Sequence, residues 1–122
     1  MDNLILILKI IYGAFFCYAG IMHFVKPRFF KNFIPDFFPK KLVNYIIGFI
    51  EIILGLGLLF SQTENNAALG IFILLILFLP IHIWDLTKER PAIGSKKKAI
   101  FRILFQFVLI SGIYSIYISK YI

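Results

Sequence analysis

The feature that most constrains the fold is an acidic residue at the middle of an apolar stretch long enough to cross a membrane. Segment 42–60 reads LVNYIIGFIEIILGLGLLF and carries Glu51 near its centre. An ionisable side chain at that depth costs at least ~2.5 kcal/mol on insertion scales, so such residues face other helices or a wet cavity. Gly48 and Gly55 share a helical face with Glu51 and permit a neighbouring helix to approach closely. We therefore expect Glu51 to point at another helix rather than at lipid.

The rest of the chain has the composition of an integral membrane protein. Hydrophobic residues make up 61% of its 122 residues, which is too apolar for a soluble domain of this size. Four apolar runs each approach the ~20 residues that span the hydrocarbon core. The predicted spans are 4–25, 42–60, 67–84 and 99–118. We predict a single all-α domain over residues 1–122, folded as an up-down bundle of four transmembrane helices in the lipid bilayer.

Connector 26–41 is predicted to contain a short interfacial helix between the first two spans. It holds five Lys or Arg, five Phe and three Pro, and Pro27 suits the first turn of a helix. Basic side chains facing the headgroups, with Phe rings dipping below them, are typical of a helix that lies in the membrane interface. The alternative is that this segment forms an apolar lid over a cavity.

The basic residues also predict an orientation in the membrane. Connector 85–98 again holds five Lys or Arg, whereas the turn 61–66 holds none. Because cytoplasmic loops carry the excess of basic residues, loops 26–41 and 85–98 are predicted to be cytoplasmic and both termini outside. The membrane would be the cytoplasmic (inner) membrane if the chain is bacterial. Orientation in a membrane accounts for the net charge of +7, so we expect no nucleic-acid partner.

Polar side chains from all four spans are predicted to gather in the half of the bundle nearest the basic connectors. Glu51 lies near the midplane of its span, and the others lie near the connector ends of theirs. No catalytic role can be assigned to any of them from the sequence. The predicted polar or ligand-binding cluster consists of His23, Glu51, His82, Asp85, Arg102 and Gln106.

Two interpretations of this cluster stay open at this stage. In the first, Glu51 pairs with Arg102, Gln106 or a histidine and only fixes the register of the helices. In the second, the cluster is the floor of a cavity, where Glu51 and a histidine exchange protons with a bound ligand. A metal held by His23, Glu51 and His82 has no spacing signature, because the three lie on different helices, so we predict no metal site.

Four motifs in order along the chain resemble a known family. They are GIMHFVKPRFF at 20–30, IPDFFP at 34–39, GFIEIILGLGLL at 48–59 and ALGIFILLILFLPIHI at 68–83. Together they resemble the DoxX-like family of small four-helix integral membrane proteins. His82 departs from the family pattern, in which asparagine is frequent at this position. The matching positions are Gly20, His23, Phe24, Pro27, Pro35, Pro39, Glu51 and Pro80.

The resemblance implies a protein that works beside another membrane protein. Members of that family include a membrane subunit of thiosulfate:quinone oxidoreductase, proteins linked to quinones or oxidative stress, and chaperone-like partners of membrane proteins. We therefore expect a bound quinone or lipid, and a membrane-protein partner or a homo-oligomer. The chain has no CxxCH, no cysteine cluster and no dinucleotide fingerprint, so we expect no intrinsic cofactor and no autonomous enzyme. The alternatives are a subunit of a quinone-linked oxidoreductase and a membrane-protein assembly factor without ligand chemistry.

Overall fold

The structure is a computed structural model that describes residues 2–121. Over this part of the chain the protein is all-helical. The four long helices are apolar enough to cross a membrane. The prediction of an all-helical chain with four helices long and apolar enough to span a membrane is confirmed. The five helices are α1 (Asp2–Val25), α2 (Pro27–Lys31), α3 (Lys40–Leu58), α4 (Glu64–Thr87) and α5 (Lys96–Ser119).

The ends of the helices follow local hydrogen bonding rather than the limits of the apolar runs. The second span was predicted to reach residue 60, but α3 ends at Leu58. The Thr63 hydroxyl donates to the carbonyl of Gly57 at 2.6 Å, and this bond closes the tight turn to α4. At the start of α5, the Ser95 side chain accepts a hydrogen bond from the Lys98 N–H at 3.2 Å. The short helix α2 begins at Pro27, as expected from its sequence.

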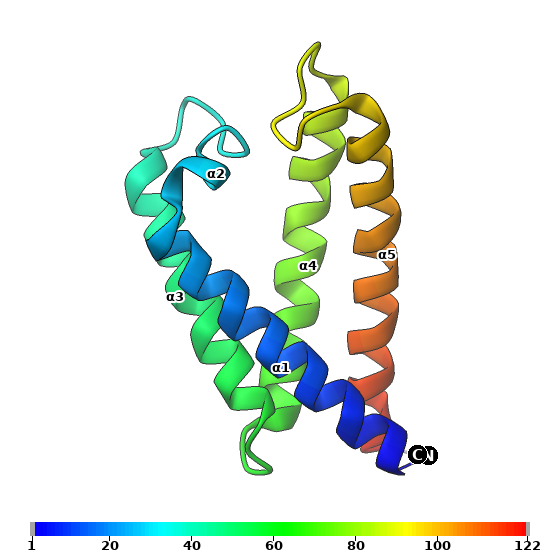
Figure 1. Ribbon diagram of the computed structural model, residues 1–122. Coiled ribbons are helices and arrows are strands. Elements are labelled where there is room, and N and C mark those ends of the chain that lie inside the picture. The colour runs from blue at the N-terminus through cyan, green and yellow to red at the C-terminus, as the bar shows by residue number, and fades with distance from the viewer. Residues whose placement is uncertain (1, 122) are drawn as a thin grey trace.

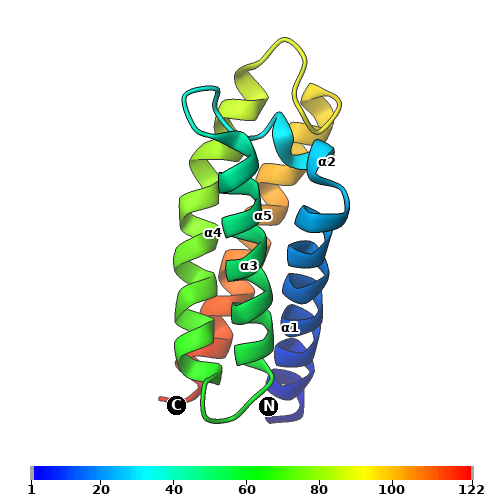
Figure 2. The ribbon, with the colours of Figure 1, turned by 90° about the vertical axis from the view of Figure 1, so that its left-hand side faces the viewer.

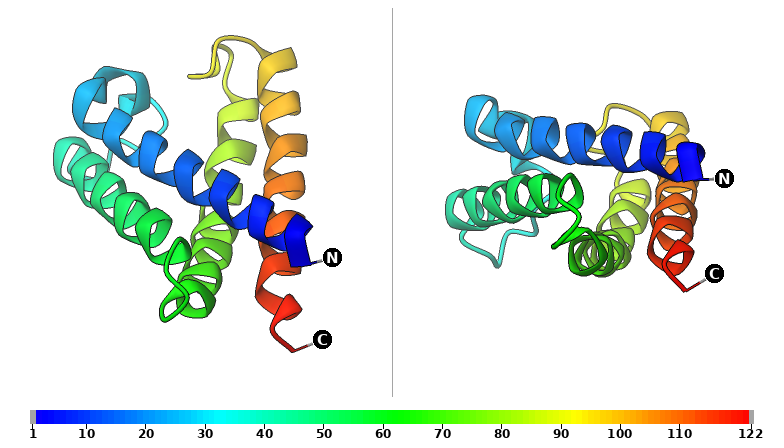
Figure 3. Two further views of the ribbon diagram at one scale, coloured as in Figure 1. Left: turned by 60° about the horizontal axis from the view of Figure 1, so that its bottom comes forward. Right: turned by 90° about the horizontal axis from the view of Figure 1, so that it is seen from below.

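The long helices are arranged as two pairs. Helix α1 packs along α3, and α4 packs along α5, with α3 also touching α4. The two pairs diverge toward the end that carries α2, as Figure 1 shows. Figures 1 and 2 show both basic connectors at that end, and the termini with the α3–α4 turn at the other. Helix α1 runs obliquely, from beside α5 near its start to α3 (Figure 3).

Glycines bring α1 and α3 into backbone contact. A Cβ built on Gly20 would lie 2.5 Å from the Gly48 carbonyl oxygen, and one on Gly48 would lie 2.6 Å from the Cβ of His23. Two turns away, Gly13 and Gly55 face each other in the same way. The predicted small-residue face of α3 is therefore the face that α1 covers, and it carries Glu51 inward with it.

The apolar core fills the half of the molecule near the termini. Phe16, Ile71 and Ile113 are almost completely buried there, on three different helices. The Tyr12 hydroxyl donates to the Leu109 carbonyl at 2.8 Å and ties α1 to α5. Large apolar side chains also cover the outer faces of the four long helices, as expected of surfaces that face lipid. The other half of the molecule is left for the polar groups.

Candidate functional site

A cavity of about 410 Å³ opens between the two helix pairs. This volume falls in the range of small-molecule sites, ~300–1,000 Å³. All five helices contribute to its wall, which is mainly apolar and rich in Phe. The polar side chains along the wall are His23, Asn44, Glu51, His82 and Arg102.

The Glu51 carboxyl meets an imidazole on the neighbouring helix. Its Oε1 lies 2.8 Å from Nε2 of His23, and only 6% of the Glu51 residue surface is exposed. The two atoms are close, but they are not aligned as a hydrogen bond, and Oε1 has no other hydrogen-bond partner among the described residues. The acid at the centre of α3 therefore faces a polar group on α1, as predicted. Its buried Oε1 can still accept a hydrogen bond from a further donor.

Asn44 fixes the orientation of the His23 ring. The Asn44 side-chain amide donates to the main-chain carbonyl of His23 at 2.7 Å. This places Asn44 Oδ1 2.6 Å from His23 Nδ1, so the nitrogen must carry the proton of that bond. With Nδ1 held by Asn44, Nε2 is the ring nitrogen that faces Glu51, 2.8 Å from Oε1.

Connector 26–41 covers one end of the cavity. The ring of Phe30, on α2, stacks on the His23 imidazole with the centroids 3.7 Å apart. Phe33, just after α2, stands edge-on to His82 on α4, with the centroids 5.8 Å apart. The connector thus reaches from α1 to α4 over the polar groups, which is the arrangement expected of a lid.

Arg102 and Gln106 form a second polar unit on the α4–α5 side. Arg102 Nη1 donates to Gln106 Oε1 at 2.8 Å. The Gln106 amide, which is completely buried, donates to the Leu75 carbonyl at 2.7 Å and so joins α5 to the backbone of α4. Gln106 is thus occupied in helix packing, while Arg102 lines the cavity.

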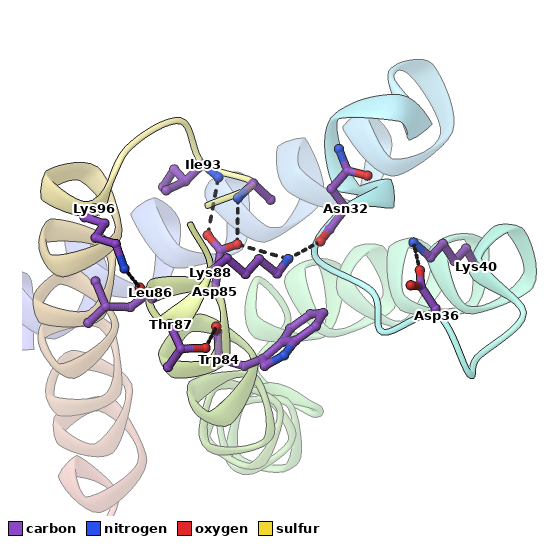
Figure 4. Close-up of polar contacts among 11 residues, drawn as sticks. Asn32, Asp36, Lys40, Trp84, Asp85, Leu86, Thr87, Lys88, Ile93 and Lys96 are labelled. Atoms are coloured by element: carbon purple, nitrogen blue, oxygen red, sulfur yellow. Dashed lines mark hydrogen bonds and ion pairs between the residues drawn. The ribbon is translucent and has the colours of Figure 1, made fainter. Parts of the chain in front are cut away.

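Asp85 lies apart from the cavity and organises the α4–α5 connector. Its carboxylate accepts hydrogen bonds from the N–H groups of Ala92 at 2.6 Å and Ile93 at 3.3 Å. Lys88 approaches the same carboxylate at 3.3 Å and donates to the Asn32 carbonyl at 2.7 Å. Figure 4 shows this chain of contacts, which links connector 26–41 to the end of α4. Asp85 therefore acts on the lid through Lys88 and not on the cavity itself.

The structure thus brings together part of the predicted cluster. His23 and Glu51 are in contact, whereas His82 makes no hydrogen bond or ion pair among residues 2–121 and only lines the wall. Over the same residues, no three His, Cys, Asp or Glu side chains are arranged to hold a metal ion. The four cavity-lining members are His23, Glu51, His82 and Arg102.

Asn44 was missed from the sequence although a signal for it was present. It precedes Gly48 by four residues and Glu51 by seven, so it shares their helical face. A buried asparagine on a close-packed face requires partners for its amide. It is 2% exposed and holds His23 by two contacts.

A family profile matches most of the chain. The family described as Domain of unknown function (DUF8561) matches residues 12–117, a range that contains every residue lining the cavity. The chain belongs to this family. No curated protein and no solved structure matches it.

Proposed function

We propose that this member of the DUF8561 family is a membrane component whose cavity binds one quinone-like or lipid-like molecule beside a partner membrane protein. The head of the molecule lies at Glu51, and its apolar part lies among the Phe side chains. The chain is not an enzyme on its own, and a place as a subunit of a quinone-linked oxidoreductase is compatible with this proposal. The resemblance to DoxX-like proteins supports the same proposal.

The main support for a bound ligand comes from one oxygen atom of the Glu51 carboxyl group. Glu51 Oε1 is buried, has no hydrogen-bond partner among the described residues, and belongs to a side chain that lines the cavity. A buried acceptor left without a donor costs about 1–3 kcal/mol. A ligand with a hydroxyl group at this position removes that cost, and the aromatic wall accommodates its apolar remainder.

We also propose how the bundle sits in the membrane. The four long helices form an up-down bundle with α2 in the interface, where Arg28 and Lys31 meet headgroups. Loops 26–41 and 85–98 face the cytoplasm, and both termini lie outside. The two basic connectors lie at the same end of the molecule, which this orientation requires (Figure 1). The lid then faces the cytoplasmic leaflet, from which the ligand enters.

A second candidate function is that of an assembly factor or structural partner without ligand chemistry. The pairing of His23 with Glu51 and Asn44 favours it, because this network fixes the register of α1 against α3. The two functions differ in what Glu51 must do. A register device needs the shape and hydrogen bonds of the side chain, whereas a ligand site needs its carboxylate.

The substitution Glu51→Gln separates the two. The glutamine amide can donate to Nε2 of His23, so the protein is expected to fold, while the acceptor offered to the ligand is changed. We expect the quinone or lipid recovered with gently purified protein, measured by mass spectrometry of extracts, to fall roughly tenfold or more.

Glu64→Gln is the matched control for this measurement. Glu64 pairs with Lys9 at 3.0 Å at the opposite end of the bundle, away from the cavity. The control is expected to retain the ligand in full. If the Glu51 variant retains as much ligand as the parent across pH, the ligand-binding proposal loses its main support and the structural one gains it.

A further inference from the structure

One charged group on the cavity wall has no ion-pair partner among residues 2–121. Glu51 is paired with His23, whose Nε2 lies 2.8 Å from Oε1. His82 makes no ion pair over the same residues. What remains on the wall is the guanidinium of Arg102, which is always protonated.

The guanidinium has no acidic partner within the described residues. Glu51 and Asp85 are both engaged by other groups: Glu51 by His23, and Asp85 by Lys88 with two backbone N–H groups. Arg102 itself donates to a neutral amide and lies 5.6 Å from the ring of Phe105. A guanidinium has five N–H donors, and one of them is used among residues 2–121. A cation that is partly withdrawn from water in this way is stabilised by a compensating anion.

We infer that the ligand of the cavity is an anionic amphiphile, whose acid group pairs with Arg102 while an adjacent hydroxyl donates to Glu51. The inference rests on the proposed ligand-binding function and narrows its substrate class. A guanidinium presents its donors as a planar fork that fits a carboxylate or phosphate with two parallel hydrogen bonds. A neutral quinone ring satisfies Arg102 with only single hydrogen bonds.

The test compares two ligands that differ only in the acid group. Tritiated 2-hydroxypalmitate and 1,2-hexadecanediol have the same chain and the same hydroxyl at C2, but only the first is an anion. Each is partitioned between phosphatidylcholine nanodiscs that contain the protein and empty nanodiscs. We expect the parent to bind 2-hydroxypalmitate roughly tenfold to a hundredfold more tightly than the diol, as for one charge-assisted pair.

Two variants locate the preference. Arg102→Gln is expected to bind both ligands equally, within about threefold. Arg28→Gln removes the same charge from an exposed position on α2 and is expected to keep the full preference for the acid. If both variants lost the preference for the acid to the same extent, that preference would reflect general attraction to a basic surface. This result would overturn the assignment to Arg102. Should Arg102→Gln fail to fold, the comparison of the two ligands in the parent still decides whether the site prefers an anion.

The outcomes distinguish this inference from the function on which it rests. If the parent binds the diol as tightly as the acid, the cavity binds ligand but the anionic class is wrong. If neither ligand binds and nothing is recovered with the purified protein, the ligand-binding function itself is wrong. Lysophosphatidate is tested as a third ligand. If it binds about tenfold more tightly than 2-hydroxypalmitate, the ligand is an anion and its acid group is the phosphate of a lipid headgroup.

Discussion

Replacing Gly48 with alanine is expected to lower the free energy of unfolding by about 2 kcal/mol, although alanine is the better helix former. The added Cβ would lie 2.6 Å from the Cβ of His23 and 2.9 Å from the carbonyl oxygen of Gly20. Neither obstacle is the mobile end of a side chain, so α1 must move away from α3. The same movement pulls His23 from Glu51. Unfolding is measured by titrating detergent-solubilised protein with sodium dodecyl sulfate.

Gly70→Ala is the matched control for this substitution. The obstacle there is Cδ2 of Leu54 at 2.7 Å, the end of a flexible side chain that can rotate away. Both substitutions bring the same gain in helix propensity, ~1 kcal/mol. We therefore expect the control to be close to the parent in stability. Equal stability of the two variants would mean that α1 and α3 are not held in backbone contact.

Replacing His23 with leucine is expected to destabilise the fold by about 3 kcal/mol or more. The change removes the polar side chain that meets Glu51 Oε1 and leaves Asn44 Oδ1 without its donor. Breaking a buried pair from one side typically costs ~3–5 kcal/mol, because the remaining charge has lost its compensation. The same unfolding titration measures the loss.

The double variant His23→Leu with Glu51→Leu distinguishes loss of the pair from loss of packing. Replacing both partners with apolar residues of similar volume is often neutral, since no uncompensated charge remains. We expect the double variant to recover most of the stability that His23→Leu loses. The Glu51→Leu variant is measured alone for comparison. If the loss of stability in the double variant equals the sum of the losses in the two single variants, the two side chains are not energetically coupled.

The sequence predicts the spans and the direction of Glu51 because both follow from strong and local constraints. An acid in the middle of an apolar helix has few tolerable environments, and the glycines at 48 and 55 indicate which face is packed. The limits of α3 were less predictable. Leu59 and Phe60 are as apolar as the residues before them, and the helix ends because Thr63 closes a turn on Gly57.

The partners within the site could not be read from the sequence, because they depend on how the helices turn about their axes. Asp85 and His82 are three residues apart, which suggests a shared face, yet Asp85 caps the N–H groups of the following connector while His82 reaches the cavity. Arg102, Gln106 or a histidine was predicted as the partner of Glu51, and the sequence did not say which. Arg102 and Gln106 pair with each other, and it is His23 that meets the acid. The depth of a residue along its helix, which the sequence gives, does not determine which polar partner its side chain meets.

The central claim, that the cavity between the helix pairs holds a bound molecule, is tested most directly by filling that cavity. Ala19 lines it, whereas Ala14 lies on the exposed face of the same helix, so Ala19→Trp and Ala14→Trp add the same bulk inside and outside the site. The measurement is mass spectrometry of small molecules extracted from gently purified parent and variants. We predict one amphiphile recovered with the parent and with Ala14→Trp, and its loss from Ala19→Trp. Equal recovery from all three proteins, or no amphiphile above background in the parent, would contradict the account.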